Sequence, residues 1–366
     1  MKKNEKSSSR RAFIRGALLN GAAISALPLA AYGHTANGYP NEITVEDIPR
    51  LPLRILLRSG LSGKHFEKIK SISPEITLIE SKDEAGFASA DVWFGGISAD
   101  QFNKARNLKW VQSPSAGVEH YLFPAMLESR VLITNAKGCY GPAIGEHTIG
   151  LLFSLTRQLS AQAKNMAEGK WERPPDMVEM KGMTMGIVGL GGIGSQVARR
   201  ARAMDMKVIA VDIVPKYREQ IGDICDDVRL VQDGGLAWLL SSADVVVSAA
   251  PHTKVSEGMF GNDEFGRMKN GAFFINVSRG KLVKTQALLA ALKSGHLAGA
   301  GLDVTDPEPL PPDHELWKQP NVIITSHISG QSQYSSERMQ DVFVENVRRY
   351  IHGLPMLNQV DKELGF

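Results

Sequence analysis

Three residues with complementary chemistry occur in order in the second half of the chain: Arg279, Glu308 and His327. They lie in the segments F-I-N-V-S-R-G, L-D-V-T-D-P-E-P and T-S-H-I-S-G, and each stands at the end of a predicted strand. A planar guanidinium can hold a carboxylate or polarise a carbonyl group, and an imidazole exchanges a proton near neutral pH. Taken singly, each residue has an ordinary structural explanation. Because open α/β sheets bind ligands at the carboxyl ends of their strands, the shared position predicts one ligand-binding edge.

A glycine-rich turn in the middle of the chain predicts a binding site for a dinucleotide. Gly189, Gly191 and Gly194 form G-x-G-x-x-G directly after an apolar run, and a segment with helical spacing follows them. A second apolar run ends in Asp212, 18 residues beyond Gly194. Glycines let backbone N–H groups and a helix N-terminus approach a pyrophosphate. Asp212 would accept hydrogen bonds from the adenosine ribose and repel a 2′-phosphate, so the sequence favours NAD over NADP.

The elements that position these residues alternate between apolar strands and helical segments, which predicts parallel sheets covered by helices on both faces. Before the glycine turn, strands are expected at Arg54–Arg58, Ile76–Glu80, Asp91–Phe94, Lys109–Gln112 and Val131–Thr134. From the turn onward they are expected at Thr184–Val188, Lys207–Val211, Val228–Val231, Val245–Ala249, Ala272–Asn276, Gly299–Asp303 and Val322–Thr325. Long helices are expected at Ala143–Lys164, as a strut between domains, and at Gln331–His352.

The predicted fold is two doubly wound α/β domains, with a Rossmann NAD-binding domain inserted into a flavodoxin-like substrate domain. The substrate domain is expected at residues 48–150 and 328–366, and the NAD-binding domain at residues 151–327. The chain of 366 residues is long enough for two such domains.

Charge is distributed unevenly along the chain. Of the net charge of +3, residues 1–33 contribute +5, because they contain six basic residues and one acid, so the remainder carries −2. The body of the protein therefore lacks the basic surface that nucleic-acid binding requires, and that partner class is excluded. The two cysteines, Cys139 and Cys225, form no C-x-x-C pair or disulfide framework, and no histidine spacing is typical of a metal site, so no metal is predicted.

The first residues are typical of an export signal. The segment S-R-R-A-F-I-R at Ser9–Arg15 is similar to a twin-arginine signal, and a mildly apolar stretch with small residues follows it. We therefore predict a signal peptide over residues 1–36, the twin-arginine export machinery as a partner, and a periplasmic location. The apolar stretch is too short and too weak for a stable membrane span, and nothing later approaches a spanning length.

From about Arg54 to the C-terminus the chain resembles the D-isomer-specific 2-hydroxyacid dehydrogenase family. The resemblance rests on four ordered motifs: G-L-G-G-I-G, N-V-S-R-G, L-A-G-A-G-L-D-V-x-x-x-E-P and the final H-I-S-G. It implies an NAD-dependent oxidoreductase that acts on a small D-2-hydroxy acid or its 2-oxo acid, of the glyoxylate or hydroxypyruvate type or larger. Family habit further implies a homodimer and the insertion topology described above.

The resemblance also assigns roles to individual residues. Arg279 would bind the substrate, His327 would exchange the proton, and Glu308 would orient the imidazole. The backbone N–H groups of Ala116 and Gly117 would hold the substrate carboxylate together with Arg279. The implied cofactor contacts are Gly189, Gly191, Gly192, Ile193, Gly194, Asp212, Pro251, Val277, Ser278, Arg279, Asp303, His327 and Gly330. One departure stands out: relatives usually carry Arg where this chain has Gly192, so a side-chain contact with the pyrophosphate is lost.

Two alternatives stay open at this point. A phosphite-type dehydrogenase would keep Arg279, Glu308 and His327, whereas a formate dehydrogenase would carry Gln in place of Glu308 and is disfavoured. A non-catalytic protein that binds or senses NAD on the same fold is also compatible with the motifs. Turnover of a 2-oxo acid with NADH distinguishes an enzyme from a sensor.

Overall fold

The computed structural model describes residues 50–174, 177–215 and 224–366. The predicted signal peptide lies outside the described residues. No helix within the three described ranges combines the length and apolar character that a membrane crossing requires.

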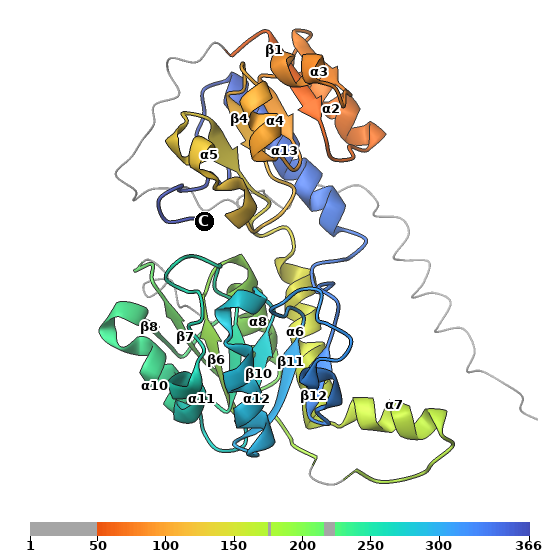
Figure 1. Cartoon of the computed structure of the whole chain (residues 1–366), viewed down its shortest axis with the longest axis vertical. Coiled ribbons are helices and arrows are strands. Elements are labelled where there is room, and N and C mark those ends of the chain that lie inside the picture. Colours follow the sequence, from red (N-terminus) through yellow and green to blue (C-terminus); the bar gives the residue numbers. More distant parts are fainter. Residues whose placement is uncertain (1–49, 175–176, 216–223) are drawn as a thin grey trace, which may run out of the picture. The chain divides into compact units, whose positions relative to one another are not determined.

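The first sheet has five parallel strands in the order β2-β1-β3-β4-β5 (Figure 1). Its strands are β1 (Leu53–Leu57), β2 (Ile76–Ile79), β3 (Val92–Phe94), β4 (Trp110–Gln112) and β5 (Leu132–Thr134). Short strands with almost every residue buried are expected of a parallel sheet that is covered on both faces.

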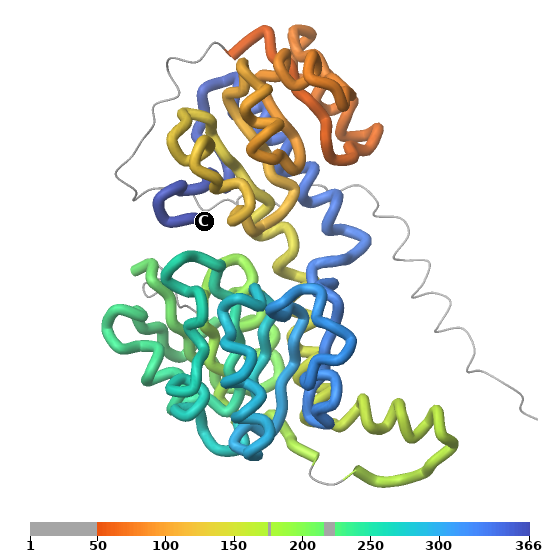
Figure 2. The backbone as a smooth tube through the Cα atoms, in the orientation of Figure 1, coloured from red at the N-terminus to blue at the C-terminus, as the bar shows by residue number. Residues whose placement is uncertain are grey.

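Helices cover both faces of this sheet, and one of them comes from the far end of the chain. One face packs against α2 (Gly63–Ile72) and α13 (Ser335–Ile351), while the other packs against α3 (Glu84–Ser89), α4 (Ala99–Lys104) and α5 (Pro124–Glu128). The tube in Figure 2 shows the blue C-terminal segment beside the orange and yellow N-terminal strands. Phe343 of α13 stacks on Phe94 of β3 with ring centroids 4.1 Å apart, so residues far apart in sequence share this core.

The second sheet has seven parallel strands in the order β12-β11-β10-β9-β6-β7-β8. Its strands are β6 (Thr184–Val188), β7 (Lys207–Asp212), β8 (Asp227–Leu230), β9 (Val245–Ser248), β10 (Ala272–Asn276), β11 (Leu297–Leu302) and β12 (Val322–Ile324). Helices α6 (Gly141–Thr156) and α8 (Gly192–Ala203) cover one face. Helices α10 (Gly235–Ser242), α11 (Asn262–Arg267) and α12 (Thr285–Lys293) cover the other. The strand order reverses between β6 and β9, which is where doubly wound sheets bind ligands.

The two parallel-sheet α/β units confirm the predicted fold class. Every predicted strand is present, and its ends differ from the prediction by at most two residues. The predicted helix Ala143–Lys164 is wrong in one respect, because the chain breaks after α6 and resumes as α7 (Leu159–Ala167). Gln158 between them adopts a left-handed conformation with φ 54°, so no single strut spans this region.

Helix α7 differs from every neighbour in its packing. None of its residues is buried, and in Figure 1 it extends away from the seven-stranded sheet. Large apolar side chains of α7 and the following segment are exposed: Leu159, Met166, Trp171 and Met177. Exposed apolar side chains that gather in one segment of the chain favour an interaction surface.

Candidate active site

The glycine turn joins β6 to α8 in the geometry that a pyrophosphate requires. Gly189 has φ +94°, and a side chain there would meet the backbone of Ala250 at 2.8 Å. A side chain at Gly194 would collide with the carbonyl oxygen of Gly189. Helix α8 begins at Gly192, directly after Gly191, so its first N–H groups face the turn. The residues present therefore fit a bound dinucleotide.

Asp212 at the end of β7 is tied to this turn. Its Oδ2 accepts a hydrogen bond from the N–H of Leu190 at 2.7 Å, and its Oδ1 accepts one from Val214 at 2.9 Å. The side chain is buried, and burial raises its pKa, while the backbone hydrogen bonds and the charge of Lys137 act in the opposite direction. The structure thus places the predicted ribose-binding carboxylate beside the predicted pyrophosphate turn.

His327 and Glu308 form a close pair. The Nδ1 atom of His327 lies 2.6 Å from Oε1 of Glu308, and Oε2 of Glu308 lies 3.4 Å from the N–H of Thr305. An ionised carboxylate only accepts hydrogen bonds, so the imidazole proton sits on Nδ1 when the ring is neutral. The other ring nitrogen, Nε2, is then the one that can exchange a proton with a substrate.

The loop that carries His327 is fixed by the buried side chain of Asp303. His327 has φ +55°, a left-handed conformation that costs about 1–2 kcal/mol for a residue with a side chain. Asp303 Oδ1 accepts hydrogen bonds from the hydroxyl of Thr325 at 2.6 Å and from the N–H of Ile328 at 3.0 Å, and Oδ2 accepts from Ser329 at 3.0 Å. These bonds on both sides of His327 hold the strained residue in place.

His147 of α6 extends this network. Its Nε2 lies 2.9 Å from the hydroxyl oxygen of Thr325 and 3.6 Å from Oδ1 of Asp303. Because the Thr325 proton goes to Asp303, the hydroxyl oxygen accepts from His147. The sequence analysis assigned no role to His147 or Thr325, since no local motif links α6 to β12.

Arg279 is held by a carboxylate that the sequence analysis missed. Its Nε donates to Oε1 of Glu119 at 2.6 Å, and its Nη1 donates to the carbonyl oxygen of Ser278 at 2.8 Å. Burial raises the pKa of Glu119, but the charge and hydrogen bond of Arg279 outweigh it and the net pKa is lowered. The Nη2 atom lies so close to Gly117 that a side chain there would displace the guanidinium.

Three hydrogen-bond donors of this region are not used within the protein. Within the described part of the chain, no hydrogen bond uses Nη2 of Arg279 or the N–H groups of Ala116 and Gly117. The carbonyl of Ala116 is anchored by Nδ2 of Asn135 at 2.8 Å, which fixes the loop. Binding of a carboxylate between the guanidinium and the two amides, which the family resemblance implies, stays a prediction.

The other predicted cofactor positions also lie at the ends of strands in the seven-stranded sheet. Ser278 is bonded through its hydroxyl to Ser248 and Asn276, each at 2.9 Å, and the neighbouring Val277 is buried. Pro251 follows β9, and its carbonyl accepts from the hydroxyl of Ser256 at 2.7 Å. The remaining two are Ile193, partly buried in α8, and Gly330, which packs on the ring of Tyr140.

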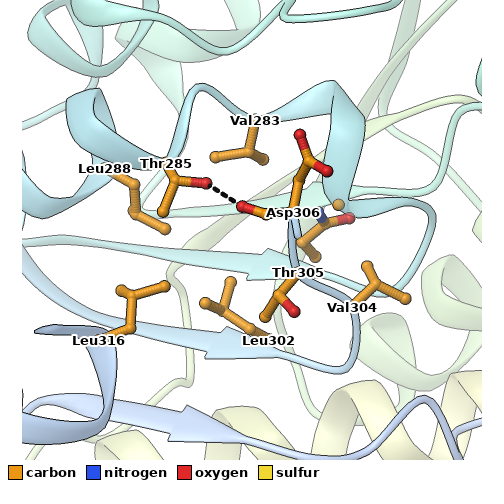
Figure 3. A pocket seen from close by; sticks show the side chains of 10 residues that line it. Val283, Thr285, Leu288, Leu302, Val304, Thr305, Asp306 and Leu316 are labelled. Carbon is orange, nitrogen blue, oxygen red and sulfur yellow. Dashed lines mark hydrogen bonds between the residues drawn. The ribbon is translucent and has the colours of Figure 1, made fainter. Parts of the chain in front are cut away.

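A small hollow lies beside the segment that precedes Glu308. It is lined by Val283, Leu288, Leu302 and Leu316 and by the backbone near Thr305, and Figure 3 shows the hydrogen bond from Thr285 to the Asp306 carbonyl, 2.9 Å long. Arg279, Glu308 and His327 do not line it. The hollow therefore belongs to the support of the loop before Glu308, not to the candidate site. No group of three metal-binding side chains occurs among the residues that the structure describes.

Comparisons with known proteins identify the family. Residues 149–329 match the family described as D-isomer specific 2-hydroxyacid dehydrogenase, NAD binding domain. The glyoxylate reductase of Thermofilum pendens is 33% identical over 273 residues, which cover 73% of this chain and 79% of that protein. The chain belongs to the D-isomer-specific 2-hydroxyacid dehydrogenase family.

Other members of the family agree with this assignment. The D-3-phosphoglycerate dehydrogenase of Archaeoglobus fulgidus is 35% identical over 268 residues, although this chain spans only 49% of its length. The crystal structure of a family protein from Aeromonas salmonicida has a TM-score of 0.74 and 31% identity, and the match covers 85% of this chain and 99% of that one. Family membership confirms the predicted class, a nicotinamide-dependent oxidoreductase of hydroxy and oxo acids, and confirms the predicted NAD-binding domain.

Proposed function

We propose that this protein interconverts a small 2-oxo acid and its D-2-hydroxy acid with NAD(H). The observation that carries the proposal is the presence of a proton-exchanging pair, His327 and Glu308, together with a guanidinium that lies against Gly117. Relatives named glyoxylate reductase, glycerate dehydrogenase and hydroxypyruvate reductase support a substrate of two or three carbons.

Each residue of the site has its own role in the reduction of the oxo acid. When bound, the reduced nicotinamide supplies a hydride to the carbonyl carbon. The Ala116 and Gly117 amides hold the substrate carboxylate with Nη2 of Arg279, whose charge also polarises the carbonyl group. As the carbonyl electron pair moves to oxygen, His327 gives that oxygen the proton on Nε2 and becomes neutral, and Glu308 stabilises the charged imidazolium beforehand. Oxidation runs the same proton transfer in reverse.

Asp212 supports a preference for NAD over NADP. Its carboxylate is fixed at the end of β7, and both oxygens keep a lone pair beyond their single backbone hydrogen bonds. A ribose hydroxyl can donate to such an oxygen, whereas a 2′-phosphate would meet a negative charge.

The test is turnover of a 2-oxo-acid panel followed by NADH absorbance. The wild-type protein should oxidise NADH with glyoxylate or hydroxypyruvate, and His327→Ala should lower turnover by about 10²–10⁴-fold while NADH still binds. His352→Ala, at an exposed histidine after α13, is the matched control and should behave as wild type. Cofactor binding without any oxo-acid turnover would favour the sensing alternative, and turnover of phosphite alone would favour a phosphite dehydrogenase.

We also propose that the protein is exported and works in the periplasm. The support is the twin-arginine-like segment at Ser9–Arg15 and the excess of positive charge before it. Because that route carries folded proteins, NAD(H) would be bound before export and retained. Replacing Arg10 and Arg11 by Lys should keep the protein in the cytoplasmic fraction, and periplasmic protein should carry nicotinamide through gel filtration. Protein recovered empty would contradict retention but not export.

The proposed homodimer is supported by the exposed arm formed by α7, residues 168–174 and Met177. Trp171 is 99% exposed and Met166 77% exposed, so a second copy of this chain would remove a large apolar area from water. Trp171→Ser with Met166→Ser should convert the dimer to a monomer in light scattering. Val255→Ser removes an equally exposed side chain elsewhere and should leave the dimer intact.

A further inference from the structure

The glycine turn offers the cofactor backbone groups but no cationic side chain. Residues 189–194 are Gly-Leu-Gly-Gly-Ile-Gly, so the charge on the pyrophosphate meets only N–H groups and the N-terminus of α8. Arg200, two turns along α8, is bonded to Gln196 and Glu146. A counter-charge for the pyrophosphate must therefore come from outside the turn.

The backbone at Gly192 lies in tight contact with the segment before α6. A side chain there would place its first carbon 3.1 Å from Cα and 3.2 Å from N of Gly138. In the same way, a side chain at Gly141 would reach the carbonyl oxygen of Gly192 at 2.5 Å. Both neighbours are backbone, which cannot rotate away as a flexible side chain can. The segment between β5 and α6 thus lies directly against the turn.

Lys137 occupies this segment, next to Gly138. Its backbone is fixed on both sides, because its N–H donates to Oδ1 of Asn135 at 3.1 Å and its carbonyl accepts from Nδ2 of Asn358 at 2.9 Å. The ammonium lies 5.7 Å from the ring centroid of Phe366, a distance at which the ring face attracts a cation. It also lies close enough to Asp212 to act on the pKa of that carboxyl group.

Two observations therefore relate Lys137 to the glycine turn. The backbone of the neighbouring Gly138 lies against Gly192 at the start of α8, and the charge of Lys137 acts on the pKa of Asp212, which accepts a hydrogen bond from Leu190 within the turn. We propose that Lys137 binds the pyrophosphate of the dinucleotide from the loop between β5 and α6, in place of the side chain that Gly192 lacks. The proposal rests on the cofactor role of the turn and adds a cation to it.

The experiment measures equilibrium binding, so it does not depend on knowing the substrate. NADH, ADP-ribose and adenosine are titrated against wild type, Lys137→Met and Lys137→Arg by calorimetry. Lys137→Met should weaken NADH and ADP-ribose about tenfold, the loss of one charge-assisted hydrogen bond, and leave adenosine unchanged. Lys137→Arg should keep wild-type affinity. Lys64→Met, which removes an exposed lysine paired with Glu337, is the matched control.

Ionic strength gives a second readout that a merely structural lysine would not move. The affinity of wild type for NADH should fall more steeply with salt than that of Lys137→Met, because salt screens the lost contact. Unchanged NADH affinity in Lys137→Met overturns the proposal, and so does an equal loss for adenosine. A loss for NADPH alone would assign Lys137 to a 2′-phosphate instead. In each of these outcomes wild-type NADH binding stays intact, so the proposed enzyme class is judged separately.

Discussion

The two sheets contribute to the candidate site in different ways. Residues 184–324 build the seven-stranded sheet, whose edge carries Arg279, Glu308 and, just beyond β12, His327. The five-stranded sheet completes its core only with α13, through side chains such as Phe343 and Tyr350. It supplies Glu119 and two amides. The reacting groups thus belong to the seven-stranded unit, which one continuous stretch of chain builds. Binding of the substrate also depends on the five-stranded unit, to which both ends of the described chain contribute.

The largest effect is expected from a substitution that disrupts the core of the five-stranded unit. Phe343 is fully buried and stacks on Phe94, so Phe343→Ala should lower the free energy of unfolding by about 3–5 kcal/mol. NADH should still bind at low denaturant, because the glycine turn lies in the other sheet. Phe274→Ala, the matched change in the seven-stranded core, should lose stability and NADH binding together. The measurement is urea unfolding monitored by fluorescence, with an NADH titration at each urea concentration. Loss of NADH binding at the same urea concentration in both variants would contradict the expected difference between the two sheets.

The second effect concerns the reacting edge alone. Glu308→Gln keeps an oxygen that can accept from Nδ1 of His327 but removes the negative charge that stabilises the imidazolium. We expect kcat to fall about 10²-fold, or about 2.7 kcal/mol, with NADH affinity unchanged. Glu315→Gln, which breaks an exposed ion pair with Lys293, should leave kcat as it is. A normal kcat with a raised KM would show that Glu308 acts in substrate binding rather than in proton transfer.

The third effect tests the contribution of the five-stranded unit. Glu119→Gln removes the charge that fixes Nε of Arg279, so the guanidinium should lose its orientation toward Gly117. KM for the oxo acid should rise about tenfold, equivalent to about 1.4 kcal/mol, with a smaller change in kcat. Glu146→Gln, at an exposed ion pair with Arg200, is the control. Loss of kcat with unchanged KM would show that Glu119 acts in the chemical step.

The same pair predicts a dependence on pH. Arg279 lowers the pKa of Glu119 below its ordinary value of 4.5, so the stabilisation is present above 4.5 and is lost as pH falls through the lowered pKa. Unfolding free energy of the wild type should therefore fall more steeply with acid than that of Glu119→Gln. Parallel acid profiles would mean that the ion pair adds nothing to stability.

Sequence alone predicted the strands well, because buried parallel strands are short apolar runs bounded by turn residues. It failed where a break has no local signal: Gln158 interrupts the helix without Gly or Pro nearby. The second long helix also begins later than predicted, at Ser335, where the hydroxyl bonds back to Ser332 and Gly330. Helical periodicity does not reveal such a start.

The same distinction applies to the candidate site. Arg279, Glu308 and His327 stand in motifs, so their order was informative before any geometry was known. Glu119 meets its partner across 160 positions, and His147 meets Thr325 across 178, and no pattern in one sequence encodes such pairings. Supporting residues that stand outside a motif and far from their partner in sequence are therefore the ones that only the structure identifies.

The smallest expected effect tests how far such support matters at the reacting edge. Thr325→Val keeps the shape of the side chain but removes the hydroxyl that donates to Asp303 and accepts from His147. Asp303 would keep its bonds from Ile328 and Ser329, so the His327 loop should loosen rather than unfold, and kcat should fall about threefold, or about 0.7 kcal/mol. Thr156→Val, whose hydroxyl bonds only within α6, should leave kcat unchanged. A loss as large as that of Glu308→Gln would mean that Thr325, and not the carboxylate alone, sets the position of His327. In that case the hydrogen bonds around Thr325 would contribute as much to kcat as the contact between Glu308 and His327.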